Sequence, residues 1–133
     1  MKTLSTLIAA MLLGGCTPAV AQYQEVLDAY SANASSSDLE PWLAGSALHQ
    51  AAESRQLLLT LGWQQLGLTE FTETSVKAES LVLSCLDVSD VSFVDSAGLE
   101  VDVERAESRL LMQIQFTKQV PLKLLSIEQV GTC

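Results

Sequence analysis

The stretch Leu110–Thr117, LLMQIQFT, indicates the fold class of this chain. Its apolar side chains at Leu110, Met112, Ile114 and Phe116 alternate with mostly polar ones. This alternation is typical of a strand in a sheet that has one face on a core. Further segments with strand character are Phe71–Val76, Ser80–Val88, Val91–Asp95, Leu99–Val103 and Val120–Val130. The second half of the chain is therefore predicted to form an antiparallel sheet.

The first half of the chain has the helical period instead. A short amphipathic helix is predicted by apolar residues at three- and four-residue spacing, which are Tyr23, Val26, Leu27 and Tyr30. A longer helix of about four turns is predicted over Ser46–Leu61, with Gly62 in the position of a C-cap glycine. Helices followed by antiparallel strands predict an α+β fold, in which the N-terminal helices pack on one curved antiparallel sheet.

The composition limits the kinds of protein that this chain can be. Its 133 residues suit one domain, and its 48% hydrophobic content is too high for a disordered chain. Lysine and arginine number 7 against 16 aspartate and glutamate residues, which gives a formal net charge of −9. This acidity argues against nucleic acid as a partner, because nucleic acid requires a basic surface. With 1 histidine and 3 cysteines, we expect no metal site and no cofactor.

The N-terminal segment predicts export from the cytoplasm. Residues 4–13 are almost continuously apolar, a run too short to span a bilayer and typical of a signal peptide. The next residues, Leu13-Gly14-Gly15-Cys16, resemble the lipobox of bacterial lipoproteins. The resemblance implies a signal peptide over 1–15, a tether over 16–22 and a single domain over 23–133. Cys16 would carry the lipid, with acyl chains such as palmitate, at the extracytoplasmic face of the cell membrane.

Two other interpretations of the N-terminal segment remain open. Ala19-Val20-Ala21 fits an A-x-A cleavage site, which would release a secreted soluble protein that starts at Gln22. An uncleaved N-terminal helix would instead keep Cys16 as an ordinary buried thiol. No later apolar run approaches the roughly 18 residues of a membrane span.

Two cysteines remain for the folded domain of an exported protein. Cys85 lies in the apolar run Leu81–Leu86, and Cys133 is the last residue. Two cysteines in an oxidising compartment predict one disulfide, which would fix the C-terminus to the sheet. A redox-active pair is the alternative, but the chain has no CxxC motif.

Three phrases of the domain are distinctive: Cys85-Leu86-Asp87, the run Val91–Asp95 followed by Gly98, and the closing Gly131-Thr132-Cys133. They resemble the nuclear-transport-factor-2-like α+β cone, in the version found as small lipoproteins of high-GC Gram-positive bacteria. The resemblance covers roughly residues 23–133 and implies helices packed on a cone-shaped sheet. The segment Lys118–Leu122 departs from it, because such proteins often carry Asp-Gly and a tryptophan in the last hairpin.

The resemblance directs attention to a candidate pocket. Cone enzymes of this superfamily use Asp with His or Tyr, so His49 and Asp87 are the pair that would carry acid–base chemistry here. Trp42 and Trp63 flank the long helix and would line a pocket or a partner surface. A single helical histidine is more often a surface or packing residue, and flanking tryptophans are more often part of the core. We therefore predict no catalytic residue.

Carboxylates between the predicted strands offer a further candidate site. Their oxygens could hold calcium loosely, but no D-x-D-x-D-G loop is present. Glu100 and Asp102 alternate with Leu99, Val101 and Val103, as on the solvated face of a strand. We expect no metal here.

Together these features predict a non-enzymatic, lipid-anchored protein of the cell envelope with a binding, accessory or scaffold role. Its partners would be the membrane, through the lipid on Cys16, and an envelope protein. One alternative is a small-molecule-binding protein or minor enzyme that uses the cone pocket. Another is a secreted soluble protein cleaved after Ala21.

Overall fold

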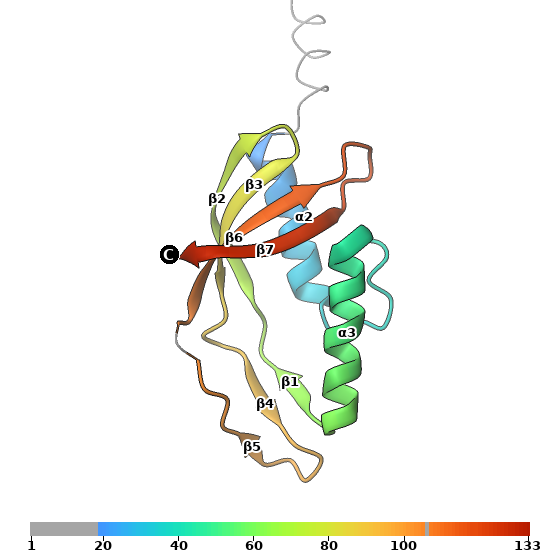
Figure 1. Ribbon diagram of the computed structural model, residues 1–133, viewed down its shortest axis with the longest axis vertical. Coiled ribbons are helices and arrows are strands. Elements are labelled where there is room, and N and C mark those ends of the chain that lie inside the picture. Colours follow the sequence, from blue (N-terminus) through green and yellow to red (C-terminus); the bar gives the residue numbers. More distant parts are fainter. Residues whose placement is uncertain (1–18, 106) are drawn as a thin grey trace, which may run out of the picture.

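A computed structural model describes residues 19–105 and 107–133 and confirms the α+β class (Figure 1). The helices are α2 (Val20–Asn33) and α3 (Gly45–Leu61). The strands are β1 (Gln64–Leu66), β2 (Glu70–Ala78), β3 (Leu81–Asp87), β4 (Ser92–Val94), β5 (Glu100–Val101), β6 (Arg109–Phe116) and β7 (Leu124–Thr132). The predicted signal peptide over 1–15 and Cys16 lie outside the described residues.

The strands form two antiparallel sheets, where the sequence predicted one. The large sheet has four strands in the order β2-β3-β6-β7, and the small sheet has three in the order β1-β4-β5. The chain leaves the large sheet after β3, contributes β4 and β5 to the small sheet, and returns to pair β6 with β3. Strand alternation alone does not say which strands pair, which explains the difference from the prediction.

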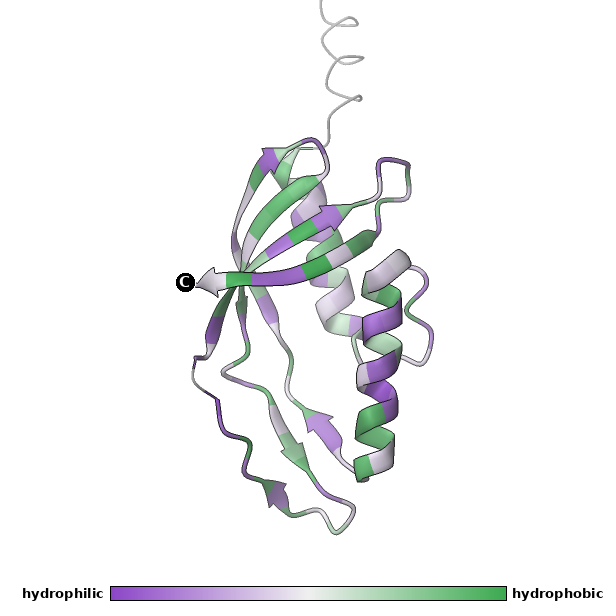
Figure 2. Ribbon diagram, viewed as in Figure 1, coloured by the Kyte–Doolittle hydropathy of each residue, from purple (hydrophilic) through white to green (hydrophobic). Residues whose placement is uncertain are grey.

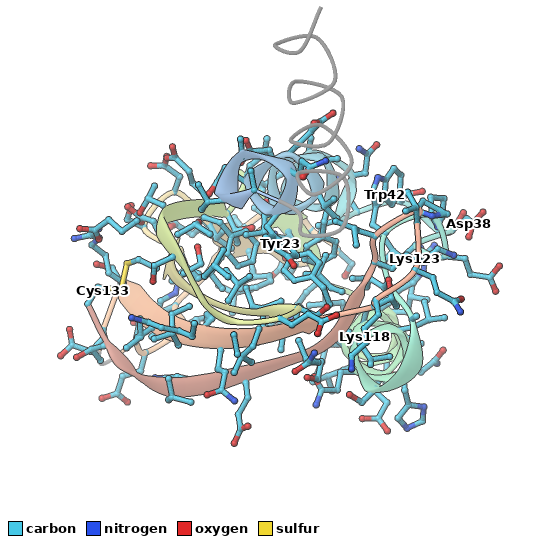
Figure 3. All side chains as sticks on the ribbon, turned by 90° about the horizontal axis from the view of Figure 1, so that it is seen from above. Tyr23, Asp38, Trp42, Lys118, Lys123 and Cys133 are labelled. Carbon is cyan, nitrogen blue, oxygen red and sulfur yellow. A yellow bond between two sulfur atoms is a disulfide. The ribbon has the colours of Figure 1, made fainter. Side chains whose placement is uncertain are left out.

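The hydrophobic core lies between α2 and the inner face of the large sheet. The Tyr23 ring of α2 contacts the Phe116 ring of β6, with centroids 4.7 Å apart (Figure 3). Leu27, one turn further along α2, is fully buried, as is Ile114 of β6. Their burial follows from the two periods in the sequence, which place these apolar side chains on facing surfaces.

Helix α2 begins earlier than the sequence predicted. It starts at Val20, so its first turn takes residues from the predicted tether over 16–22. The Gln22 side chain accepts a hydrogen bond from the backbone N–H of Ala19, at 2.8 Å, and so caps the helix. An N-terminal backbone donor gains a partner in this way, which stabilises the helix start.

The start of α3 is attached to the large sheet, whereas its second half extends beyond that sheet. The N–H of Leu124 in β7 donates to the carbonyl of Trp42, and the N–H of Ala44 donates to the carbonyl of Leu124. From residue 52 to 61 every side chain is exposed except the half-buried Leu58. Gly62 ends the helix with φ of 71°, which confirms the predicted C-cap.

Two strands of the small sheet differ from the sequence prediction. Strand β1 was not predicted, and it is only 3 residues long. Strand β5 has 2 residues where Leu99–Val103 was predicted, because pairing with β4 involves only Val101 and Glu100. The predicted turn at Asp95–Gly98 is confirmed, since the N–H of Gly98 donates to the carbonyl of Asp95 at 3.0 Å.

The last strand also starts later than predicted. Strand β7 begins at Leu124, so residues 120–123 of the predicted strand Val120–Val130 lie in the connection from β6. That connection closes on itself, because the N–H of Lys123 donates to Thr117 Oγ1 and the N–H of Thr117 donates to the carbonyl of Lys123. Backbone groups that bond within the connection are not free for the ladder with β6.

Gly67 allows the connection after β1 to approach the connection after β3. Its φ is 80°, and a Cβ at this position would lie 1.9 Å from the carbonyl oxygen of Asp90. Both the backbone conformation and the lack of space require glycine here. The close approach holds the small sheet against the chain that leaves the large one.

We predict that Gly67→Ala destabilises the protein far more than Gly98→Ala. Gly98 has nearly the same φ, 79°, but nothing lies within 4 Å of its Cβ position, so it is a matched control for backbone strain alone. We expect Gly98→Ala to cost about 1 kcal/mol of unfolding free energy and Gly67→Ala about 2 kcal/mol more. Urea denaturation measures both, and equal losses would contradict the close approach.

Candidate functional site

A polar network joins α2 to the large sheet and was not anticipated from the sequence. The side-chain amide of Gln24 donates to the carbonyl of Phe71 at 2.7 Å, and its oxygen accepts a hydrogen bond from Thr74 Oγ1. Thr74 Oγ1 lies 2.8 Å from the Oγ of Ser84, which is fully buried and donates to the carbonyl of Thr72. These groups are neutral and satisfy one another, so the network positions α2 on β2 and β3 and supplies no proton-transfer group.

His49 lies on the solvent side of α3. Its Nε2 is 2.8 Å from a carboxylate oxygen of Glu53 one turn along, and both side chains are largely exposed. An exposed pair at this spacing is typical of a helix surface. His49 therefore has water and Glu53 around it, and no enclosed surface to which a substrate would bind.

Asp87 lies at the end of β3, where it organises the backbone that follows. Its Oδ1 accepts hydrogen bonds from the backbone N–H of Ser89, at 2.9 Å, and from Ser89 Oγ, at 2.6 Å. These bonds, with a smaller contribution from the Arg109 charge, hold the pKa of Asp87 below its usual value. A lowered pKa suits a structural carboxylate and is the wrong direction for a general acid or base near neutral pH.

The two tryptophans lie at opposite ends of α3. Trp42 precedes the helix and Trp63 follows it, and the 17 residues between the helix bounds span about 25 Å. Both are half-buried. Trp63 contacts Phe93 of β4, with ring centroids 6.0 Å apart, and so forms the centre of the small sheet's packing. The structure therefore does not bring Trp42, Trp63, His49 and Asp87 together around one pocket.

Cys85 and Cys133 lie together on the outer face of the large sheet. Their Cα atoms are 6.1 Å apart, a separation compatible with the predicted disulfide (Figure 3). Cys85 belongs to β3 and Cys133 follows β7, although β6 lies between these strands in the sheet order. The pair thus connects β3 to the residue that follows β7, and the N–H of Cys133 donates to the carbonyl of Arg109 in β6, which lies between them.

An ion pair lies beside the cysteines. Arg109 of β6 donates to a carboxylate oxygen of Glu73 in β2 at 2.7 Å. Glu73 sits at an irregularity in the β2–β3 register with φ of 52°, a conformation uncommon outside glycine. Residues from all four strands of the large sheet therefore meet here.

Glu73, Cys85 and Cys133 could act as metal ligands only if the two cysteines were reduced to thiols. A Glu73 oxygen and the two cysteine sulfurs lie within 4.8 Å of one another. Metals bind cysteine as the thiolate, and a bridged pair has none to offer. With the cysteines bridged, the cluster connects the strands and holds no ion.

The end of the molecule formed by the small sheet and the last turns of α3 has hydrophobic and hydrophilic residues side by side along its ribbon (Figure 2), and six of its leucines are exposed. We call these residues the distal surface: Leu57, Leu59 and Leu61 of α3, Leu66 of β1, Leu68, and Leu99 before β5. Leu57 is 58% exposed, Leu59 63% and Leu99 66%. The sequence pattern placed Leu59 on the apolar stripe of the long helix and Leu99 in a strand, but it did not predict their exposure, because a leucine in a helix or strand looks the same whether its face is covered or open.

Two hollows flank the distal surface. One, of about 270 Å³, lies between α3 and the chain that precedes it, and its apolar lining includes Leu39, Leu48 and Leu59. The other, of about 380 Å³, lies on the small sheet over Val91, Phe93 and Val101. The first hollow is mainly apolar, and the second also has Ser92, Glu100, Asp102 and Arg105 in its lining. Hollows of this kind beside exposed leucines are features of surfaces that bind other molecules.

Comparisons with protein-family models, with curated proteins and with solved structures gave no match to this chain. No helix within residues 19–105 and 107–133 is long and apolar enough to cross a membrane.

We predict that Cys133→Ser lowers the free energy of unfolding by about 4 kcal/mol, because the cross-link closes a loop with a sequence separation of 48. Urea denaturation of the oxidised protein measures the loss. The wild-type chain in a dithiol reductant serves as the matched control and should show the same loss, whereas Cys133→Ser should not respond to the reductant. A wild-type chain indifferent to reduction contradicts the bridge.

Proposed function

We propose that this protein is a non-enzymatic, lipid-anchored module of the cell envelope that binds a protein partner on its distal surface. The lipid would be attached to Cys16, which lies outside the described residues. The carrying observation is the distal surface itself, where six leucines are more than two-fifths exposed and lie beside two hollows. The anchor rests on the lipobox pattern of the sequence.

The start of α2 supports lipidation at Cys16 over cleavage after Ala21. Ala19 caps the helix through its contact with Gln22, and Val20 is the first helical residue. A cut after Ala21 would remove this cap and the first helical residues. A mature chain that starts at Cys16 keeps the whole of α2 and leaves a short tether before it.

The distribution of charge supports an orientation with the distal surface away from the membrane. Lys77, Lys118 and Lys123 lie on or beside the β2–β3 and β6–β7 hairpins, where Glu79 is the neighbouring carboxylate, and these hairpins lie toward the end of the molecule where α2 starts (Figure 1). Carboxylates such as Glu100 and Asp102 lie at the opposite end. An anionic lipid surface attracts the lysines and repels the carboxylates. The distal surface would then be open to a partner.

The lack of an internal core in the distal half also supports a partner. Val91 is the buried apolar side chain of the small sheet, and Phe93, Val94 and Val101 are only half-buried. A small sheet with little buried apolar area is marginally stable by itself. A partner that covers the distal surface would add the burial that this half lacks.

The proposed fold within the α+β class is the nuclear-transport-factor-2-like cone. The antiparallel order of the large sheet and the helices packed on its inner face support it. The separate small sheet extends beyond that arrangement and carries part of the proposed binding surface.

The anchor has a direct test. We expect the wild-type chain in the membrane fraction, with the intact mass of its first mature residue shifted by a diacylglycerol and an acyl group. Cys16→Ser should abolish both the shift and the membrane association, whereas Cys85→Ser controls for loss of a cysteine elsewhere. A mature chain that begins at Gln22 would contradict the anchor.

The binding surface has a separate test. A photoreactive residue placed at Leu57 should cross-link to another protein in intact cells, because the side chain is exposed and would lie in the interface. The matched control is Val120, which is 89% exposed but lies on the β6–β7 connection. Cross-links at Val120 and none at Leu57 would contradict the proposal, because they would place the interface at the β6–β7 connection and not on the distal surface.

A further inference from the structure

The outer edge of β5 is an open edge of the small sheet. Strand β5 pairs with β4 alone, through Phe93 with Val101 and Val94 with Glu100. In the order β1-β4-β5 it is an outermost strand, and in Figure 1 the chain from β5 toward β6 runs along the border of the molecule. An open edge presents backbone N–H and C=O groups to which another strand can bond.

The side chains along this edge alternate strictly in character. Leu99, Val101 and Val103 are apolar, and Leu99 is 66% exposed and Val103 38% exposed. The intervening residues, Glu100, Asp102 and Glu104, are acidic and exposed. Only Glu100 and Val101 form β5, so a strand added at this edge would extend β5 along Leu99–Glu104 and would then face an apolar row on one side of the sheet and a carboxylate row on the other.

A hollow lies directly beside the apolar row. It has a volume of about 380 Å³, and Val91, Phe93, Val101 and Val103 are among its lining residues. Arg105 borders it, and its guanidinium donates to the carbonyls of Val88 and Val91. The hollow thus combines these apolar side chains with the polar groups of Ser92, Glu100 and Asp102, and its size suits a side chain from an added strand.

The residues around the edge carry mostly negative charge. The segment from Asp87 to Glu107 holds seven carboxylates, and Arg105 is its single cation. A second copy of this chain would meet like charge, because the chain carries a formal net charge of −9. Opposite charges directly across two strands stabilise their pairing, and like charges oppose it.

We propose that the edge from Leu99 to Glu104 binds an extended segment of the partner protein, in which apolar and basic residues alternate. The segment adds as a further strand to the small sheet, with its apolar side chains on the Leu99, Val101 and Val103 row and its basic side chains on the carboxylate row. This inference rests on the proposed function and names the chemistry of the partner.

The probe is a fluorescent twelve-residue peptide that alternates valine and lysine, tested by anisotropy against the full chain in detergent. We expect saturable binding, with amide shifts in nuclear magnetic resonance spectra centred on Leu99–Glu104. A peptide of the same composition in two blocks, and one that alternates valine and glutamate, should bind at least about tenfold more weakly. Equal binding of the blocked peptide would overturn the proposal, because simple charge attraction would then suffice.

The variant test separates this edge from the general acidity of the chain. Combined Glu100→Lys, Asp102→Lys and Glu104→Lys should weaken the alternating peptide at least about tenfold. The matched control is combined Glu25→Lys, Glu40→Lys and Glu128→Lys, which changes the net charge equally at exposed sites elsewhere. Equal weakening by both sets would refute the site.

A backbone variant tests the strand-addition mode itself. Asp102→Pro removes one N–H from the open edge. The carbonyl of Leu99 faces β4, so the alternation of an extended chain turns the N–H of Asp102 outward, and this N–H has no partner among the described residues. We expect weaker peptide binding with an unchanged melting temperature. Unchanged binding, or amide shifts confined to α3, would overturn the inference and leave the proposed function standing. The proposed function has a different contradiction: in the otherwise wild-type chain, a photoreactive residue at Leu57 would form no cross-link to another protein in cells.

Discussion

The packing of Tyr23 and Leu27 against the inner face of the large sheet is the contact on which the rest of the structure depends. It fixes α2 across the sheet, and the fully buried Ile114 and Phe116 of β6 provide the opposing surface. Burial of such side chains is the largest favourable contribution to folding. The core is thereby confined to one half of the molecule, and the small sheet and the second half of α3 extend from it.

This division explains where binding groups can be exposed without loss of the fold. The proximal half holds the core and the cross-linked end of the curved sheet, and α2 places the chain toward Cys16 at that half. The distal half keeps apolar and acidic groups open to solvent, because no core contact depends on them. A protein held by its N-terminus would then present the distal half outward. The proposed arrangement, a tethered module with one packed half and one binding half, is consistent with how little core so short a chain can build.

Sequence patterns revealed the elements but not their assembly. The alternation in Leu110–Thr117 and the spacing of Tyr23 and Leu27 predicted β6 and α2, because core-facing periods are local signals. Strand β1 was not predicted, because residues Gln64–Leu66 show no alternation of apolar and polar side chains. The division into two sheets depends on pairing between distant residues, which no local pattern encodes. The exposed state of Leu57 depends equally on what lies opposite it in space.

Native-state hydrogen exchange tests the division into two halves most directly. Amides of α2, β3 and β6 should exchange only through global unfolding, since these elements enclose the core. Amides of β1, β4, β5 and the last two turns of α3 should exchange through local opening, with protection lower by about two orders of magnitude or more. Uniform protection across both sheets would show that the distal half has a core of its own and would contradict the account.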